Sequence, residues 1–411
     1  MRTTSRLAHR AAELDAADPL SGLRARFLGH DDPDVPAYLD GNSLGRPLTA
    51  TLERLNEFVR NQWGGRLIRG WDESWLELPR RLGDELGRTV LGAAPGQCVV
   101  ADSTTVLLYK LARAAVEAGG DRTEIVLDRD NFPTDRYIME GIAAECGLTL
   151  RWAEADYDGG VSPEAVAEVI GPRTSLVVLS HVAYRSGYIA DVPAITDLVH
   201  RAGGRVLWDL CHSAGSVPAE LDAWNVDYAA GCSYKYLNGG PGAPAWAYVA
   251  ARHQADFRQP IQGWLGAGDP FGMARDYVPA AGIQRLVSGT PPILGMLAIQ
   301  DTVALIGEAG MDAVRKKSEL LTGFAVDAFD EVLAPLGAVL ASPRDPARRG
   351  SHVTVDHPSF REVTARLWDQ GIIPDYRNPN GIRLGLSPLS TSFAETWTGI
   401  EAIAAELGSR A

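Results

Sequence analysis

Short apolar segments alternate with amphipathic helical patterns between residues 98 and 250, and this alternation constrains the fold more than any other feature. The apolar segments, which we interpret as strands, lie at residues 98–101, 125–127, 148–152, 176–179, 206–208, 226–230 and 245–250. Helical patterns at residues 105–118, 134–146 and 195–202 separate several of them. Apolar strands joined by helices indicate a mainly parallel sheet with both faces covered. We therefore expect an α/β fold with a large domain over residues 40–290.

The pattern changes after Pro291-Pro292, where we expect a smaller α+β domain over residues 291–411. Two helical patterns, at residues 293–306 and 311–333, begin this domain. Short strands are expected at residues 339, 353–355, 372–373 and 382–384, and helices at residues 360–370 and 393–407. Nearer the N-terminus, helices are expected at residues 1–18, 47–62 and 76–91, the second with Leu48, Leu52, Leu55 and Val59 on its apolar face.

Composition argues against several classes of partner and location. The 411 residues carry 39 basic and 52 acidic side chains, and a net charge of -13 disfavours nucleic acid and anionic membranes as partners. No apolar segment approaches the ~18 residues of a membrane span, and the N-terminus lacks the apolar region of a signal peptide. The four cysteines form no metal-binding pattern, so we expect reduced, buried thiols, no metal and a cytoplasmic location.

The segment Gly231-Cys-Ser-Tyr-Lys-Tyr-Leu-Asn-Gly-Gly-Pro-Gly242 is the strongest sign of chemistry. Its lysine, Lys235, follows one expected strand, and Asp209 ends the strand before it. A lysine amine forms a Schiff base with pyridoxal 5'-phosphate, and a carboxylate pairs with the protonated pyridine nitrogen of that cofactor. A lone lysine is usually a solvated surface residue, and the glycines alone would also fit a plain turn. The pairing with Asp209 favours the cofactor.

Two further segments fit contacts to such a cofactor. Ser103-Thr104-Thr105 closes a strand and begins a helix, and the free amides and hydroxyls of a helix N-terminus suit a phosphate. A plain helix cap is the alternative for these residues. Phe132 and Asp135 follow the next strand, where a phenyl ring can stack on the pyridine face. An ordinary helix start is the alternative there.

Seven motifs along the chain resemble those of the kynureninase family, in the family's order. They are Tyr38-Leu-Asp-Gly-Asn-Ser-Leu-Gly45, Asp102-Ser-Thr-Thr-Val106, Asn131-Phe-Pro-Thr-Asp135, Trp208-Asp-Leu-Cys-His212, Ser233-Tyr-Lys-Tyr-Leu-Asn-Gly-Gly-Pro-Gly242, Gly289-Thr-Pro-Pro-Ile293 and Arg377-Asn-Pro-Asn-Gly-Ile-Arg383. Kynureninases hydrolyse L-kynurenine to anthranilate and L-alanine with pyridoxal 5'-phosphate. The resemblance implies the pyridoxal-phosphate-dependent transferase fold of the aspartate aminotransferases, with residues 1–39 packed on the small domain.

The resemblance also implies roles for single residues. The cofactor would contact Thr104, Thr105, Phe132, Asp135, Ser180, Asp209, His212, Tyr234 and Lys235. Of these, Lys235, Tyr234 and Asp209 would take part in catalysis, Tyr234 by binding the phosphate and delivering protons. Trp264 and Thr290 match positions that reach the cofactor from the partner subunit, which implies a homodimer with shared active sites.

On the substrate side, the resemblance assigns the α-carboxylate to Arg383. A planar cation that is always charged suits this role, and Arg377, six residues earlier, is the alternative. Asn42, Ser43 and residues 70–75, which include Trp71 and Trp75, would line the pocket for the substrate's ring.

Two other classes of protein stay possible from the sequence. One is another enzyme of the same fold, such as a cysteine desulfurase or a class V aminotransferase. A desulfurase needs an exposed cysteine on a mobile loop, whereas Cys98, Cys146, Cys211 and Cys232 lie in or beside expected regular elements. The other is a cofactor-binding protein without activity, against which the presence of both Lys235 and Arg383 argues.

The chain departs from the family pattern at Ser390. The family's Pro-Leu-Tyr-Thr-Ser-Phe reads here Pro388-Leu-Ser-Thr-Ser-Phe393, so a small hydroxyl replaces an aromatic ring. The preferred ring substitution of the substrate therefore stays open, as does the choice between tryptophan breakdown and a specialised pathway.

Overall fold

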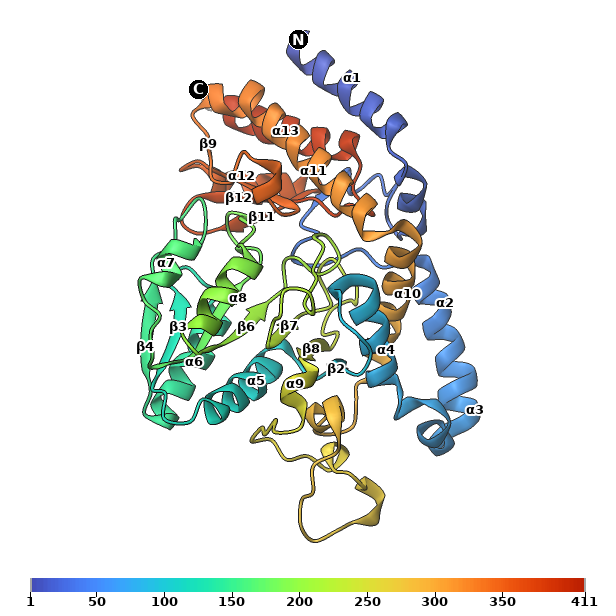
Figure 1. The fold of residues 1–411 in the computed structure, drawn as a ribbon. Coiled ribbons are helices and arrows are strands. Elements are labelled where there is room, and N and C mark those ends of the chain that lie inside the picture. The colour runs from blue at the N-terminus through green and yellow to red at the C-terminus, as the bar shows by residue number, and fades with distance from the viewer. Residues whose placement is uncertain (1, 410–411) are drawn as a thin grey trace.

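Two sheets organise the chain, one of seven strands and one of five (Figure 1). The computed structural model describes residues 2–409, and side chains from residue 4 to residue 409. In spatial order, the large sheet consists of β2 (Cys98–Ala101), β8 (Ala245–Val249), β7 (Tyr228–Gly231), β6 (Arg205–Asp209), β5 (Thr174–Ser180), β3 (Glu124–Asp128) and β4 (Thr149–Ala153).

The large sheet is mainly parallel, as the alternation of strands and helices predicted. The pairs β7/β6, β6/β5, β5/β3 and β3/β4 are parallel, and β8 is antiparallel to both of its neighbours. Strand β2 therefore runs in the same direction as β7. All seven strands lie where the sequence predicted them, to within a few residues. The short apolar runs identified them because β2, β3, β7 and β8 are buried along their whole length.

Helices cover both faces of the large sheet. On one face, α5 (Thr104–Ala118) and α6 (Pro133–Cys146) contribute side chains such as Leu107 and Met139 to the core. The other face packs against α4 (Leu78–Leu86), α7 (Pro163–Ala167), α8 (Val192–Arg201) and α10 (Ile293–Ala309). The buried side chains of α10 thus belong to the core of the large sheet.

The small sheet lies at the end of the molecule where both ends of the described chain are found (Figure 1). Its strands are, in spatial order, β1 (Ala37–Leu39), β11 (Ile372–Arg377), β12 (Gly381–Gly385), β10 (His352–Asp356) and β9 (Val339–Leu340). Its helices are α1 (Arg2–Ala17), α11 (Met311–Ala328), α12 (Phe360–Asp369) and α13 (Phe393–Gly408). A separate apolar core joins them to the sheet.

The N-terminal segment is part of this small unit. Strand β1 pairs in parallel with β11, and α1 packs along α13. Asp15 accepts hydrogen bonds from the backbone amides of Phe393 and Ala394, which begin α13, and Asp18 pairs with the buried Lys317 at 2.5 Å. The domain limits of 40–290 and 291–411, with 1–39 on the small domain, stay a prediction.

Between the last strand of the large sheet and α10 the chain forms a long excursion. After α9 (Ala251–Gln254), residues 255–292 run through short turns and project from the end of the molecule opposite the small sheet (Figure 1). Several large apolar side chains are exposed on this segment, including those of Trp264, Phe271, Met273 and Val278.

Two expectations about burial are wrong, the first of them in part. Of the apolar face predicted on the helix that became α2 (Thr49–Glu57) and its flanks, Leu48 and Leu55 pack on the core, whereas Leu52 and Val59 are 51% and 46% exposed. The helix instead buries Thr51, and its continuation as a π-helical turn at Phe58–Trp63 shifts the phase and buries Phe58. Cys146, expected to be buried, is exposed at the end of α6.

Within residues 2–409, no single helix is long and apolar enough to span a membrane. In this part of the chain, only α10 together with the helical stretch Met311–Leu336 reaches that length and apolar character, and the two are bent by 87° relative to each other.

Candidate active site

Three strand ends and one helix start converge at a single edge of the large sheet. Ser180, which ends β5, lies in register with Asp209, which ends β6, and Asp209 lies in register with Ala230 of β7. Because β2 runs in the same direction, the N-terminus of α5 emerges at this edge too. Ligands of open α/β sheets bind at the carboxyl ends of the strands, so these residues can share one ligand.

The loop after β7 folds tightly enough to turn Lys235 back toward this edge. Its closing hydrogen bonds run from Gly239 to the carbonyl of Ser233 (2.8 Å) and from Asn238 to that of Lys235 (3.0 Å). A Cβ on Gly239 would lie 2.8 Å from Ser233 Oγ, and Gly240 has a φ of +86°. Both expected properties of the glycines, close approach and positive φ, are therefore present.

Lys235 differs from the other lysines in its surroundings. The chain has four lysines: Lys110 and Lys317 are buried and each pairs with an aspartate at 2.5 Å, and Lys316 is exposed. Lys235 is only 8% exposed, yet no ion pair joins it to a carboxylate in the part of the chain that the structure describes. Its ammonium nitrogen lies 3.2 Å from His212 Nε2 and faces the rings of Phe132 and Tyr234.

Two buried carboxyl groups lie near Lys235. Asp209 accepts a hydrogen bond from the Cys211 amide (2.7 Å), which fixes its side chain at the strand end. Asp135 is 1% exposed, and its Oδ2 has no hydrogen-bond partner among the described residues. Burial, and after it the charge of Asp209, raises the pKa of Asp135 well above its usual value. Such a pair of acids provides a place for one cationic group with an N–H donor.

His212 joins the two halves of the site. Its Nε2 lies 3.2 Å from Lys235 Nζ and 3.4 Å from a terminal nitrogen of Arg383, which belongs to the small sheet. Burial, and after it the charge of Lys235, lowers the pKa of His212 well below its usual value. The imidazole is therefore neutral and can accept a hydrogen bond between two cations.

The phenyl ring of Phe132 and the hydroxyl of Ser180 are held in place by a network behind the strand ends. Asn131 accepts from the Phe132 amide (2.7 Å) and from Ser180 Oγ (3.0 Å), and donates to the carbonyl of Val178 (3.2 Å). The ring of Phe132 packs edge-on against Tyr184, with 5.4 Å between centroids. Phe132 is thus a rigid wall beside Lys235.

The start of α5 has the properties expected of an anion site. Ser103 caps the helix by accepting from the Val106 amide, so the alternative of a plain cap holds for Ser103. The hydroxyls of Thr104 and Thr105 have no side-chain hydrogen bond among those described. Asp102, which turns the chain with a φ of +46°, is held by Lys110. No described contact joins Tyr234 to Thr104 or Thr105.

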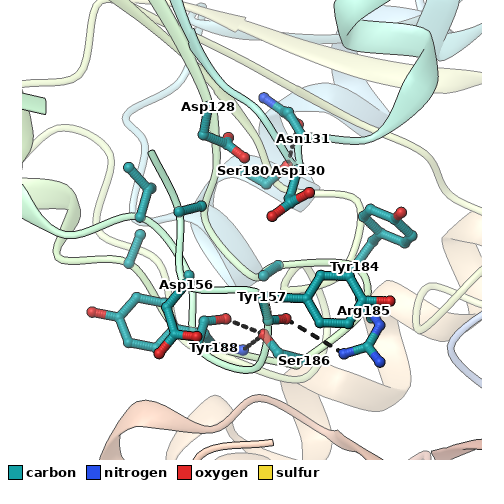
Figure 2. Close-up of a pocket in the computed structure, with 16 residues that line it drawn as sticks. Asp128, Asp130, Asn131, Asp156, Tyr157, Ser180, Tyr184, Arg185, Ser186 and Tyr188 are labelled. Carbon is teal, nitrogen blue, oxygen red and sulfur yellow. Dashed lines mark hydrogen bonds between the residues drawn. The ribbon is translucent and has the colours of Figure 1, made fainter. Parts of the chain in front are cut away.

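A small cavity of about 40 Å³ lies beside the ends of β3 and β5 and is lined by Asn131, Ser180 and Tyr184 (Figure 2). It has room for water but not for an aromatic amino acid. Asp128 and Asp130 also line it, and burial followed by the charge of Asp130 raises the pKa of Asp128 to about 7. An acidic lining repels phosphate, which favours the start of α5 for that group.

Arg383 is fully buried and densely bonded. Its side chain donates to Ser43 Oγ (2.9 Å) and to the carbonyl of Tyr184, and pairs with Asp375 Oδ2 (2.7 Å). With its amide turned to satisfy both neighbours, Asn42 accepts from Arg383 Nε (2.8 Å) and donates to Asp40 (3.2 Å). The structure thus brings together Arg383, Asn42 and Ser43.

Arg377, the alternative carboxylate ligand, takes a different position. Its Nε donates a hydrogen bond to Asp375 Oδ2 at 2.7 Å, and no described hydrogen bond joins Arg377 to His212 or Lys235. Arg383, which reaches His212, is the better placed of the two arginines for a ligand held by Lys235.

Trp264 and Thr290 are not brought to Lys235 within the described chain. Both are exposed, and Trp264 packs edge-on against Phe271 of the projecting segment. Thr290 instead lines an apolar groove of about 580 Å³ that also contains Trp71 and Trp75. The groove continues over Phe58, Trp63, Leu67, Ile68 and residues 291–295. Ser390, the departure from the family pattern, is buried in the loop after β12.

Comparisons with solved structures define the class of protein first. A cysteine desulfurase from Thermococcus onnurineus superposes with a TM-score of 0.81 at 18% identity, covering 93% of this chain and 99% of that one. A cysteine desulfurase from Escherichia coli gives a TM-score of 0.77 at 17% identity, covering 95% and 98%. The fold is therefore that of the pyridoxal-phosphate-dependent enzymes of the aspartate aminotransferase type.

Sequence comparisons then identify the family. A kynureninase from Pseudomonas fluorescens is 40% identical over 94% of this chain and 92% of its own length, and one from Burkholderia pseudomallei is 39% identical over 96% and 94%. The family model for the kynureninase C-terminal domain matches residues 314–403, and the model for the DegT/DnrJ/EryC1/StrS aminotransferase family matches residues 96–233. This chain belongs to the kynureninase family, as the motifs indicated.

The residues at the strand ends fit the cofactor of this family. An unpartnered buried carboxyl oxygen on Asp135, beside Asp209, suits a protonated ring nitrogen, and Lys235 lacks the carboxylate partner that the other buried lysines have. Pyridoxal 5'-phosphate supplies a ring that accepts the electron pair of a bond broken next to its imine.

Several residues of the site were missed from the sequence. Asp375 and Asp40 carry the charges around Arg383, and Asn131 holds Phe132 and Ser180. Asn131 could have been found, because it begins a motif already singled out. The contact between Asp375 and Arg383 depends on the register of two antiparallel strands, which a single sequence does not give.

Proposed function

We propose that this protein hydrolyses L-kynurenine to anthranilate and L-alanine. Water adds to the aryl ketone carbon, the bond between that carbon and the β-carbon breaks, and the β-carbon takes up a proton. Membership of the kynureninase family supports the reaction. The single structural observation that carries the proposal is His212, which lies within 3.4 Å of both Lys235 and Arg383. One α-amino acid can therefore meet both cations at once.

The roles proposed for the residues follow from this geometry. Lys235 holds the cofactor and moves the α-proton, since its amine is buried without a carboxylate that would fix it. Asp209 stabilises the protonated ring, and Phe132 covers one face of it. Thr104, Thr105 and Tyr234 bind the phosphate, Arg383 binds the substrate α-carboxylate, and Asn42 and Ser43 hold Arg383 in place.

The test is a turnover assay with L-kynurenine on the purified enzyme loaded with pyridoxal 5'-phosphate. We expect equal amounts of anthranilate, followed by its fluorescence, and L-alanine, followed by chromatography. A change of the cofactor absorbance on mixing shows binding separately from turnover. Binding without release of anthranilate would overturn the proposed reaction while leaving the cofactor site in place.

A cysteine desulfurase of the same fold is the alternative. Cys98, Cys211 and Cys232 are buried, and the exposed Cys146 ends a helix on the outer face of the large sheet. Cys211 and Cys232 follow β6 and β7 in loops near Lys235, but their burial denies them the exposed thiol that a desulfurase needs. Sulfide release from L-cysteine, measured in parallel with anthranilate release, decides between the two activities.

We propose further that the active site is completed by a second copy of the chain. Trp264 and Thr290 are exposed and lie in regions rich in exposed apolar side chains, which soluble monomers rarely show in such numbers. The apolar groove over Trp71 and Trp75 has Thr290 at its edge. A dimer that covers these surfaces would place Trp264 and Thr290 at the partner's cofactor.

Complementation between inactive variants tests the shared site. Lys235→Ala and Trp264→Ala proteins, each nearly inactive, are mixed under conditions in which subunit exchange is demonstrated. One hybrid site then has both native residues, so activity should recover toward a quarter of the native value on statistical pairing. Absence of recovery with exchange demonstrated would exclude a site shared through Trp264.

The substrate ring and the cellular location complete the proposal. We propose a cytoplasmic enzyme whose ring pocket is widened at Ser390, so that a hydroxyl or methyl substituent on kynurenine is accepted. A methyl group that fills an apolar gap gains about 1 kcal/mol, or roughly fivefold in kcat/KM. Comparison of kynurenine with 3-hydroxykynurenine and a methylated analogue, in the native enzyme and in Ser390→Tyr, tests this. A preference that does not change in Ser390→Tyr contradicts it.

A further inference from the structure

Asp375 occupies a special position next to Arg383. The two residues face each other directly across β11 and β12, and Asp375 Oδ2 lies 2.7 Å from a terminal nitrogen of Arg383. The same oxygen accepts from Arg377 Nε, also at 2.7 Å. One carboxylate oxygen is thus shared by two arginines, only one of which reaches the site.

The other contacts of Arg383 leave its guanidinium little freedom. Asn42 accepts a hydrogen bond from Nε, Ser43 Oγ accepts one from a terminal nitrogen, and the carbonyl of Tyr184 accepts one from the other terminal nitrogen. Asp375 is the only carboxylate in an ion pair with Arg383 among the residues that the structure describes. The one N–H that remains, on the terminal nitrogen that donates to Tyr184, faces His212, and through it Lys235.

A guanidinium recognises a carboxylate through parallel N–H bonds, so the orientation of its plane decides how well the ligand fits. A neutral partner holds such a plane more weakly than a charged one, because hydrogen bonds to charged groups are the stronger kind. Arg377 in turn restrains Asp375 and draws part of its charge away from Arg383, which leaves Arg383 able to accept a second carboxylate.

We propose that Asp375, restrained by Arg377, is the positioning residue that orients Arg383 toward the substrate's α-carboxylate. This rests on the proposed role of Arg383. The effect of Asp375 is then specific to ligands that carry the α-carboxylate. A merely structural role in the small sheet would weaken all ligands alike or none.

The experiment compares two ligands on the cofactor-loaded enzyme: L-kynurenine, and the amine that lacks only its α-carboxylate. Dissociation constants come from the change of cofactor absorbance, and KM and kcat from anthranilate release. In Asp375→Asn the dissociation constant and KM of L-kynurenine should rise about 30-fold, and those for the amine should change less than about twofold. Asp375→Glu should recover part of the loss.

Two further variants complete the design. Asp330→Asn removes the carboxylate of an exposed ion pair with Arg344 in the same part of the chain, and should change neither dissociation constant. Arg377→Gln leaves the contact between Asp375 and Arg383 in place, and should raise the constant for L-kynurenine alone by about threefold. If Asp375→Asn does not fold, Arg377→Gln alone still tests the positioning role of Asp375.

Arg383→Lys separates this inference from the proposal on which it rests. If Arg383→Lys weakens only L-kynurenine while Asp375→Asn and Arg377→Gln weaken both ligands equally, or neither, the positioning role is wrong and the role of Arg383 stands. If Arg383→Lys itself does not distinguish the two ligands, the carboxylate site has been misassigned, and both proposals fall.

Discussion

The two cations of the site are held in opposite ways. Lys235, on the large sheet, has a neutral histidine and two aromatic rings as neighbours. Arg383, on the small sheet, has an aspartate, a serine, an asparagine and a backbone carbonyl. The few partners of Lys235 suit the proposed role of a group that forms and breaks a covalent bond, and the many partners of Arg383 suit the proposed role of a group that only recognises a charge.

Lys110 shows what a buried lysine looks like when it is structural. It is fully buried, pairs with Asp102 at 2.5 Å and donates to the carbonyl of Leu286 at 2.7 Å. Burial lowers its pKa, and Asp102 opposes that shift. The difference between Lys110 and Lys235 therefore lies in the neighbours rather than in depth.

The largest effect is expected from Lys235→Ala. Loss of the amine removes both the attachment of the cofactor and the group that moves the α-proton, so kcat should fall by about 10⁴-fold or more. The absorbance of the lysine-bound cofactor should disappear while the circular dichroism spectrum and melting temperature stay native. Lys316→Ala, at the exposed lysine, serves as the control. Persistence of the absorbance would place the attachment on another lysine.

Asp209→Ala should have the next largest effect. The ring nitrogen then loses the carboxylate that balances its charge, and kcat should fall by about 10²–10³-fold, or about 3–4 kcal/mol. The affinity for the cofactor should fall as well, as measured by titration of the apoenzyme. Near-native kcat at saturating cofactor would contradict the assignment of Asp209.

Lys110→Met should act on stability instead of chemistry. Removal of one partner leaves Asp102 without its cation, which lowers the free energy of unfolding by about 2–3 kcal/mol. At saturating cofactor, kcat should stay within about threefold of native, because Lys110 has no contact with the reacting groups. Urea unfolding followed by circular dichroism measures the first quantity. A fall in kcat of well over threefold, with an unchanged free energy of unfolding, would contradict the distinction between the two lysines.

The sequence predicted the large sheet well, and the residues proposed for the cofactor meet at one edge of it, for a physical reason. Strands buried on both faces appear as short apolar runs, and the residues at their ends follow directly in the sequence, as Asp209 does. The position of Lys235 could be predicted as well, because the glycine-rich loop that turns it back toward the sheet edge follows directly in the sequence.

The substrate side depended on contacts between distant segments. The partners of Arg383 come from residues 42, 43, 184 and 375, and their meeting depends on strand register and on the packing of the small sheet against the large one. The part of the α2 prediction that is wrong, the burial of Leu52 and Val59, has a related cause. An apolar face on a helix indicates that something covers it, but the pattern is the same for a core and for a second subunit.

The smallest expected effect concerns Asp40, which reaches Arg383 through Asn42. Burial, and after it the charge of Asp375, raises the pKa of Asp40 to about 6. Above that pH the ionised carboxylate adds negative charge beside the proposed position of the substrate's α-carboxylate. The KM for L-kynurenine should therefore fall about threefold as the pH drops from about 7 to about 5. In Asp40→Asn this dependence should be absent.

The raised pKa of Asp40 also determines how the free energy of unfolding changes with pH. The pKa of an unfolded aspartate is about 3.9, so the folded state holds the Asp40 proton more tightly. The corresponding stabilisation is fully present below about pH 4 and is lost as the pH rises through about 6. Asp40→Asn should therefore stabilise the protein by about 2–3 kcal/mol at pH 7 and leave it nearly unchanged at pH 4. Asp121→Asn, at an exposed position, controls for the charge change. An Asp40→Asn enzyme whose KM and unfolding free energy follow pH as in the native protein would show that Asp40 does not tune the arginine side of the site.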